Sequence, residues 1–471
     1  MKHQNAKFGL ILGRALAGCG ETFCAHQLQT WCNRNNIDLE IFAFDGKKMA
    51  RSKSHNIEYT GYRENDLDSL KEQLESKDVV IFFTYPYAKS EHSYVRNFYN
   101  KIVKGVNKPI KIGFIHEVHK TYIDKIPYMI GIMNNMDAIY GYGPETWFNK
   151  AMQKMFPSKV QNGRVKRMSL WFDFEDQAKF RNTAPNKERK VMYIGRWTST
   201  KEPHRLLFLS PYIKQLDSNF KIVLKGIERS IGAKEDIYNN VYCIDMTNLK
   251  KGPQPNEKGM AEVYKEYIHD DAMQEMSKTM FGCTFFHLDK HPEEYGHRME
   301  YTQMEIINCG AIPIFDIHWA KHNIMASTGM SYYDYNIKYP FMIVSDREQL
   351  EDTAKEMMAI ANDTNKQEEM IINGFNVIKA EFDANIICPK MLQDFIDIGK
   401  DTAKFQSDED IIKHLIDDEY VEEYLRLYNQ YKDTDIIVWG YREMYEKNIF
   451  AILDGKKEKE LQEFKKNRTR K

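Results

Sequence analysis

Short apolar runs alternate with amphipathic stretches along most of the chain. This alternation predicts parallel strands connected by helices. Before residue 172 we expect strands at 7–13, 39–44, 78–83, 110–115, 138–142 and 165–170. Between them, a helical pattern covers residues 21–33, 67–76, 92–104, 122–134 and 145–155. Continuous apolar runs such as 78–83 are typical of central parallel strands. We therefore predict a first α/β domain over residues 1–175.

The same pattern restarts after a polar stretch at 172–188, which we interpret as an interdomain linker. Strands are expected at 190–194, 219–224, 240–245, 281–287, 311–315 and 341–344. Helices are expected near 204, at 260–280 and 299–307, from 346 onward, and at 382–399. This predicts a second α/β domain over 176–400. Charged amphipathic patterns at 408–431 and 434–454 predict a helical extension over 401–471, with a basic end that is a frayed tail or contacts DNA.

The stretch 281–315 organises the second domain as strand, loop, helix, tight turn and strand. A helix that follows a strand points free backbone N–H groups at the sheet edge, where phosphate is the usual ligand. Cys309 and Gly310 end the predicted helix. Glu305, one turn before them, can accept hydrogen bonds from a ribose. Glu300 precedes Glu305 by five residues, so the two glutamates do not share one helical face closely. An ordinary βαβ unit with solvated carboxylates fits the same pattern.

Other candidate residues follow predicted strands, whose carboxyl ends face the ligand crevice in this class of fold. Gly18 and Gly20 would let backbone approach a sugar or phosphate, although the loop lacks the dinucleotide pattern GxGxxG and also fits a plain turn. His116 and Glu117 are candidates for acid–base or orienting work, or belong to a surface turn.

Two clusters of cations point to phosphate. Arg196 and Lys201 flank a polar turn at a strand end, where they would suit a diphosphate leaving group. The cluster that contains Arg51, Lys53 and His55 would contact a phosphate backbone, and a solvated loop is the alternative.

Composition narrows the class of protein. The chain has 471 residues, a hydrophobic content of 42% and a formal charge of −1, which suit two cores and neither demand nor exclude a nucleic-acid partner. No apolar run reaches the roughly 18 residues that a membrane span needs. The seven cysteines form no CxxC pair, so we expect reduced thiols of a cytoplasmic protein and no metal site.

Six stretches resemble, in order, the DNA α-glucosyltransferases of T-even bacteriophages, which glycosylate 5-hydroxymethylcytosine in DNA. They are RALAGCGETFCAHQLQTW, RSKSH, IHE, IGRWTSTK, KGIERS and MEYTQMEIINCGAIPIF. Together they span most of residues 7–400, whereas 401–471 lie outside the resemblance. The resemblance implies a GT-B fold, in which two Rossmann-like domains face a central cleft.

The resemblance also implies roles for single residues. Arg196 and Lys201 would clamp the diphosphate of a UDP-sugar, and Glu305 would bind its ribose. The remaining donor contacts would come from Gly18 and Gly20 beside the sugar, from the turn Gly226, Ile227, Glu228 and Arg229 at the uracil, and from the backbone of Glu300, Tyr301 and Thr302 at the β-phosphate. The wider retaining families carry a glutamate eight residues before Glu305, where this chain has His297. The donor sugar, glucose or arabinose, therefore stays open.

The expected reaction is transfer with retention to double-stranded DNA that contains 5-hydroxymethylcytosine, in the cytoplasm of an infected bacterium. The departing phosphate would take the proton, and Glu117, with His116 beside it, would face the acceptor. The base would be flipped out. We expect a monomer with no cofactor, no metal and no membrane contact. Cations that would hold DNA phosphates are Arg51, Lys53, His55, Lys101, Lys104, Lys108, Lys159, Arg164 and Lys166. A glycan or small-molecule acceptor, or an inactive nucleotide- or DNA-binding protein, are the alternatives.

Overall fold

The computed structural model of the chain describes most of residues 1–401. The described residues are 1–12, 20–44, 57–83, 97–115, 133, 135–142, 149, 152–153, 156–196, 201–227, 261–264, 267–285, 299–401, 422, 426 and 429, with only the backbone given at 196, 227 and 263.

The first sheet has seven parallel strands in the order β3-β2-β1-β4-β5-β6-β7. These strands are β1 (Lys7–Leu12), β2 (Asp38–Phe44), β3 (Thr60–Tyr62), β4 (Val79–Phe82), β5 (Ile110–Ile115), β6 (Ala138–Gly141) and β7 (Val165–Arg167). The helical elements around it are η1 (His3–Asn5), α1 (Gly20–Arg34), η2 (Glu64–Asp66), α2 (Leu67–Glu75), η3 (Tyr99–Lys104) and α7 (Pro157–Gln161).

The second sheet has six parallel strands in the order β10-β9-β8-β11-β12-β13. They are β8 (Glu188–Arg196), β9 (Lys221–Ile227), β10 (Glu262–Tyr264), β11 (Thr279–Cys283), β12 (Ile312–Asp316) and β13 (Ile343–Ser345). The helical elements are η4 (Asp176–Phe180), α8 (His204–Leu216), α10 (His269–Met276), α12 (Tyr301–Asn308), α13 (Ile317–His322), α14 (Tyr332–Lys338), α15 (Leu350–Ala361), α16 (Thr364–Phe382) and α17 (Ala384–Asp397).

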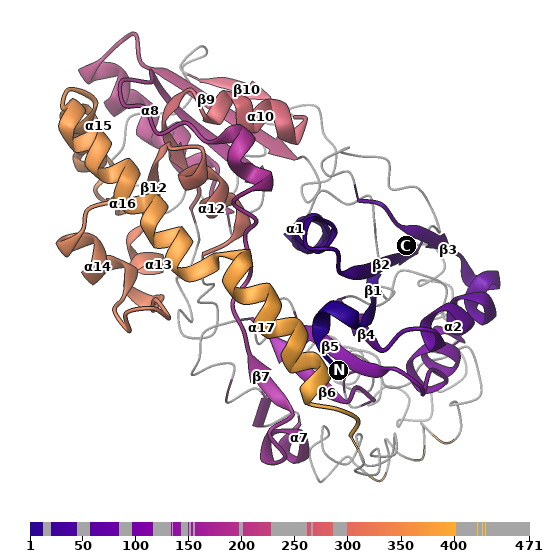
Figure 1. Ribbon diagram of the computed structural model, residues 1–471. Helices are drawn as coiled ribbons and strands as arrows, with labels where there is room; N and C mark the ends of the chain where they lie inside the picture. The colour runs from indigo at the N-terminus through magenta and orange to yellow at the C-terminus, as the bar shows by residue number, and fades with distance from the viewer. Residues whose placement is uncertain are drawn as a thin grey trace, which may run out of the picture.

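One hydrophobic cluster joins the two halves of the molecule. It contains Phe23 and Trp31 of α1, Trp171 of the connecting segment, Tyr301 of α12 and Phe395 of α17. Figure 1 shows α1 end-on between the two sheets, and α16 and α17 running in succession from the second sheet to the first. Helix α17, within the range assigned above to the second domain, therefore packs on the first sheet.

Acidic residues in the last turn of α17 and just beyond it hold this helix on the first domain. Asp394 accepts a hydrogen bond from the Tyr140 hydroxyl at 2.6 Å and pairs with Lys166. Asp401 pairs with Lys159 at 3.0 Å and with Arg164 at 3.5 Å. These contacts return the chain to the first sheet after it has completed the second.

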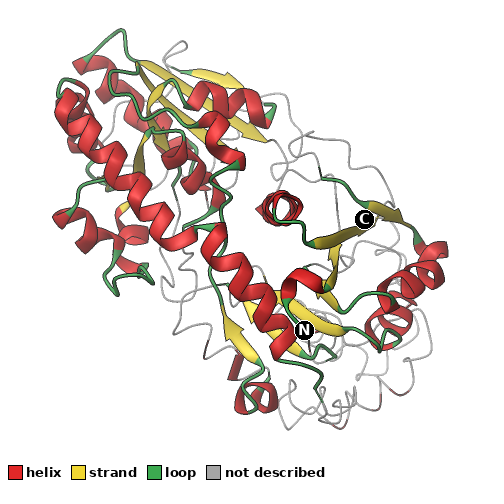
Figure 2. Ribbon diagram, viewed as in Figure 1, coloured by secondary structure: helices red, strands yellow, loops and turns green. Residues whose placement is uncertain are grey.

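The two parallel sheets and their connecting helices, which Figure 2 shows, confirm the predicted α/β fold class. The expectation of one helix over 260–280 was wrong, because this range contains β10, α10 and the start of β11. The strand β3 and the helices α13 and α14 were not predicted. Outside the described residues lie the predicted elements at 122–134, 145–155, 240–245, 408–431 and 434–454, apart from a few single positions.

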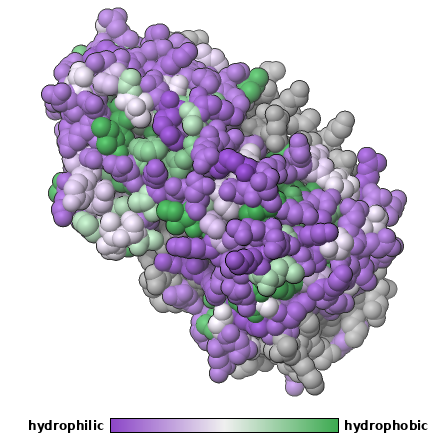
Figure 3. Space-filling view, in the orientation of Figure 1, coloured by the Kyte–Doolittle hydropathy of each residue, from purple (hydrophilic) through white to green (hydrophobic). Residues whose placement is uncertain are grey.

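The face seen in Figure 3 is mostly hydrophilic, with small hydrophobic areas between the hydrophilic residues. Within the described residues, no helix is both long and apolar enough to cross a membrane.

Candidate active site

The carboxyl edge of the second sheet carries two glycines side by side. Strands β8 and β9 stay paired to their ends, where Gly195 lies opposite Gly226 and Arg196 opposite Ile227. Gly195 has a φ of 153°, and a Cβ there would lie 3.1 Å from the Tyr193 hydroxyl. Because neither glycine carries a side chain, a ligand can approach the backbone closely here.

Lys201 lies just beyond this edge and faces the start of α12. Its side chain is largely buried, and its ammonium group pairs with the carboxylate of Glu300. Glu300 is the N-cap residue of α12, and its backbone N–H donates to the Gln303 side chain at 2.8 Å. A cation and the positive end of a helix dipole therefore meet at one place, as an anion site requires.

The backbone next to Lys201 is strained and is held by a buried ionic network. Glu202 has a φ of 39°, a left-handed conformation that non-glycine residues seldom adopt. Its carboxylate pairs with Arg205 and Arg347, and Arg205 also bonds Asp316 at 2.5 Å. Burial disfavours the charged guanidinium, but Glu202 and Asp316 outweigh it and raise the pKa of Arg205. The network fixes the turn that presents Lys201.

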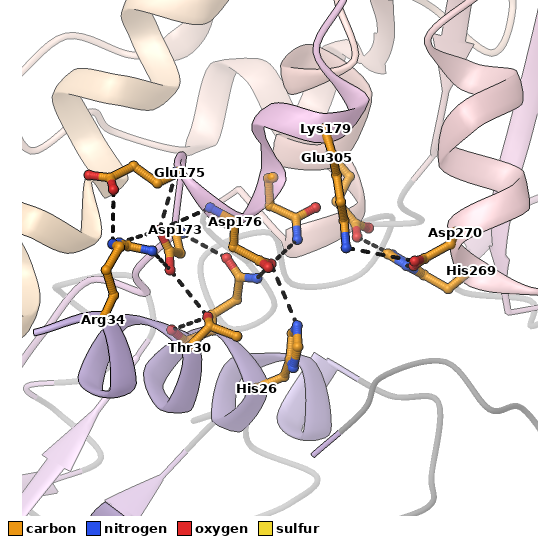
Figure 4. A network of polar contacts seen from close by, with 12 residues as sticks. His26, Thr30, Arg34, Asp173, Glu175, Asp176, Lys179, His269, Asp270 and Glu305 are labelled. Carbon is orange, nitrogen blue, oxygen red and sulfur yellow. Dashed lines mark hydrogen bonds and ion pairs between the residues drawn. The ribbon is translucent and has the colours of Figure 1, made fainter. Parts of the chain in front are cut away.

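A second ion pair lies further along α12. Glu305, 6% exposed, accepts a hydrogen bond from Nε2 of His269, 8% exposed, at 2.5 Å. Asp270 lies 3.1 Å from Nδ1 of the same ring. Burial lowers the pKa of His269, but the negative charges of Glu305 and Asp270 outweigh it and raise that pKa to about 9. Figure 4 shows His269, Asp270 and Glu305 beside Lys179. The same view shows the polar contacts between α1 and the connecting segment at residues 173–176.

The first domain meets the start of α12 through α1. A Cβ on Gly20 would lie 3.9 Å from the Tyr301 ring, and the Phe23 and Tyr301 rings pack edge-to-face at 4.8 Å. The Tyr142 hydroxyl donates to the carbonyl oxygen of Met299 at 2.7 Å. Since the Tyr301 side chain is buried in this contact, only its backbone N–H can face a ligand.

The structure thus brings together the backbone of Arg196 with that of Ile227, Lys201 with Glu300, and Gly20 with Tyr301. Glu305 lies on the same helix as Glu300, with a different cation. Predicted site residues outside the described part of the chain are Gly18, Arg51, Lys53, His55, His116, Glu117, Glu228, Arg229 and His297, together with the side chains of Arg196 and Ile227.

Two predicted DNA contacts, Lys101 and Lys104, lie on the surface of η3. Lys101 pairs with Asp68 of α2 at 2.8 Å, and the Lys104 ammonium lies 4.8 Å from the centre of the Tyr99 ring. Exposed pairs of this kind are weak, so a phosphate can replace the partner. Lys166 instead pairs with Asp394 of α17, and Lys159 and Arg164 pair with Asp401 just beyond that helix.

The sequence interpretation missed His269 and the Glu202 network. The acidic pair Asp270 and Asp271 marks the first turn of α10 and was available as a sign of a helix start at this point. No spacing connects His269 with Glu305, because they come from different elements, 36 residues apart.

The comparisons with known proteins decide the family. The sequence model of a family described as DNA alpha-glucosyltransferase matches residues 19–363. The chain belongs to the DNA alpha-glucosyltransferase family. A curated relative, the DNA alpha-glucosyltransferase of Enterobacteria phage T4, is 24% identical over 332 residues, which are 65% of this chain and 79% of the relative.

Solved structures establish the fold of this DNA alpha-glucosyltransferase family member. An alpha-glucosyltransferase solved with UDP and a 13-mer DNA containing a HMU base has a TM-score of 0.67 and 17% identity, and covers 83% of this chain and 99% of that one. A second, solved with UDP-glucose and DNA containing an abasic site, has a TM-score of 0.68 with the same identity and coverage. A variant of S. aureus TarM, 10% identical with the same coverage, has a TM-score of 0.54. The predicted GT-B fold is confirmed.

Proposed function

We propose that this chain transfers glucose from UDP-glucose to the hydroxymethyl group of 5-hydroxymethylcytosine in double-stranded DNA, with retention at the anomeric carbon. The observation that carries the proposal is the meeting of Lys201 with the N-terminus of α12, one turn from the Glu305 pair. Membership of the DNA alpha-glucosyltransferase family supports the reaction type, and one solved relative is a complex with UDP-glucose and DNA containing an abasic site.

The donor lies with its diphosphate between Lys201 and the first N–H groups of α12. Arg196 adds a second cation from the end of β8, and the phosphate oxygens replace Glu300 as the partner of Lys201. The uracil lies over the glycine pair Gly195 and Gly226, and Glu305 accepts hydrogen bonds from the ribose hydroxyl groups. This charge stabilises the UDP leaving group without a resident cofactor or metal ion.

Transfer takes place on the face of the sugar from which UDP departs. The hydroxymethyl oxygen forms the new bond to the anomeric carbon while the bond from that carbon to the phosphate oxygen breaks. The leaving phosphate takes the hydroxyl proton, and Glu117 orients the hydroxyl group.

The acceptor base leaves the duplex, because a hydroxymethyl group in the major groove does not reach an enclosed donor. Flipping a base costs a few kcal/mol. Cations of the first domain, among them Lys101 and Lys104, offset this cost by binding the flanking phosphates, so DNA affinity falls steeply with salt. The enzyme acts as a monomer in the cytoplasm of an infected bacterium.

Incubation of the chain with duplex DNA containing 5-hydroxymethylcytosine and a panel of UDP-sugars, followed by mass spectrometry of the nucleosides, tests the proposal. A hexose adduct with UDP-glucose supports it. A pentose adduct with UDP-arabinose would show that the donor is UDP-arabinose and not UDP-glucose. Transfer only to glycans or small molecules would show that DNA is not the acceptor. Binding of UDP-sugar and DNA without transfer would make the chain an inactive binding protein.

A further inference from the structure

Both ring nitrogens of His269 face carboxylate oxygens. Nε2 lies 2.5 Å from Oε1 of Glu305, and Nδ1 lies 3.1 Å from Oδ1 of Asp270. An ionised carboxylate accepts hydrogen bonds and donates none, so both nitrogens must carry a proton for both bonds to form. The geometry therefore holds His269 as an imidazolium cation.

Two further elements, α1 and η4, pack around the ring and fix its orientation. Phe23 of α1 lies 5.6 Å from it and Phe180 of η4 lies 6.2 Å from it, measured between ring centres. Lys179 of η4 pairs with Asp270 at 3.7 Å. Because the ring is enclosed, His269 cannot turn away from Glu305 without moving α1 or η4. The hydrogen bond from His269 to Oε1 therefore fixes the orientation of the Glu305 carboxylate.

We propose that His269 is a positioning residue for the ribose of the donor, because it holds the Glu305 carboxylate so that Oε2 accepts hydrogen bonds from the ribose hydroxyl groups. The inference rests on the proposed function, which assigns Glu305 to the ribose. It adds a residue from α10 to donor recognition. Because Phe23 packs against the His269 ring, the position of α1 also affects this site.

The arrangement gives donor binding a dependence on pH. The pKa of His269 is raised to about 9, so the imidazolium is complete at pH 7 and is lost as the pH rises through about 9. Within the described residues, Asp270 from α10 and Glu305 from α12 are charged groups that contact it, and Lys179 from η4 pairs with Asp270. Burial raises the pKa of Tyr267 and of Cys309, which face Glu305, so both stay neutral in this range.

Calorimetric titration with UDP and with 2′,3′-dideoxy-UDP separates positioning from a structural role. The wild-type chain should bind UDP about twentyfold more tightly than the dideoxy compound, because Glu305 gains the hydrogen bonds of the ribose. His269→Ala should lose most of this preference while its affinity for dideoxy-UDP stays within about twofold. His322→Ala on α13, whose Nδ1 faces only the His318 carbonyl in the described structure, is the matched control and should keep the full preference.

His269→Gln keeps a donor toward Glu305 without the charge, and it serves if the alanine variant does not fold. Its preference for UDP should be intermediate and flat between pH 7.5 and pH 10, whereas that of the wild type should fall about tenfold over this range. Wild-type preference and wild-type pH dependence in the glutamine variant would overturn the role of His269. A wild-type chain that binds no UDP would instead overturn the proposed function itself.

Discussion

Glu300 and Glu305 stand five residues apart on one short helix, yet they meet different cations in different surroundings. Glu300 opens α12, keeps 24% of its side chain exposed and pairs with Lys201. Glu305 is almost fully buried and pairs with His269, which aromatic rings enclose. A lysine on a flexible stem can exchange its partner for a phosphate, whereas the enclosed imidazolium cannot. The start of α12 therefore suits the diphosphate, whose negative charge grows as the bond to the sugar breaks, and its later turn suits the ribose, whose charge does not change.

Removing the exchangeable cation should have the largest effect. Lys201→Ala takes away charge that the leaving diphosphate needs in the transition state, so kcat should fall about 10² to 10³-fold. Steady-state kinetics with modified DNA measures it. Lys214→Ala, at a partly exposed lysine on α8 that donates to the Ser218 carbonyl, is the control. A kcat of Lys201→Ala within threefold of the wild-type value would show that Lys201 does not stabilise the leaving diphosphate.

The ionic network of Glu202, which holds the turn next to Lys201, should contribute to the free energy of unfolding. Glu202→Gln leaves Arg205 and Arg347 with an incomplete set of buried carboxylates, and the free energy of unfolding should fall by about 3 kcal/mol. Denaturant titration measures the change. Glu351→Gln removes an exposed pair with Lys355 on α15 and should leave the stability almost unchanged. Equal effects of the two substitutions would mean that the Glu202 network does not hold the strained turn.

Changing the buried carboxylate should separate binding from turnover. Glu305→Gln weakens the hydrogen bonds to the ribose equally in the ground state and the transition state. The KM for the UDP-sugar should therefore rise about ten- to fiftyfold while kcat stays within threefold. A fall in kcat with an unchanged KM would place Glu305 at the reacting sugar instead.

The smallest effect should have the opposite sign. Glu300→Gln removes the carboxylate that competes with phosphate for Lys201, and the amide can still cap α12. UDP should then bind about threefold more tightly, as fluorescence or calorimetric titration can measure. Weaker binding would show that the Glu300 charge itself contacts the donor and is not displaced.

The same contrast shows what one sequence can predict. The unit that contains β11, α12 and β12 follows from local chemistry, because an apolar run, a helical pattern and the pair Cys309 and Gly310 each act over a few residues. The short edge strand β10 does not follow, since it has only three residues and pairs with β9 through backbone groups. The helix predicted over 260–280 therefore combined β10 with α10 and the start of β11.

The site divides in the same way. Arg196, Lys201, Glu300 and Glu305 could be chosen because motifs and strand ends identify them. His269 and the partners of Glu202 could not, because their roles depend on contacts between elements far apart in the sequence. The positive φ of Glu202 was also hidden, since its side chain gives no sign of a left-handed backbone.

A crystal structure of the chain with UDP tests the central claim most directly. The account predicts that the diphosphate lies at the N-terminus of α12 within hydrogen-bond distance of Lys201, which has left Glu300, while Glu305 contacts the ribose and still holds His269. A diphosphate bound away from Lys201, or a ribose out of reach of Glu305, would contradict the account.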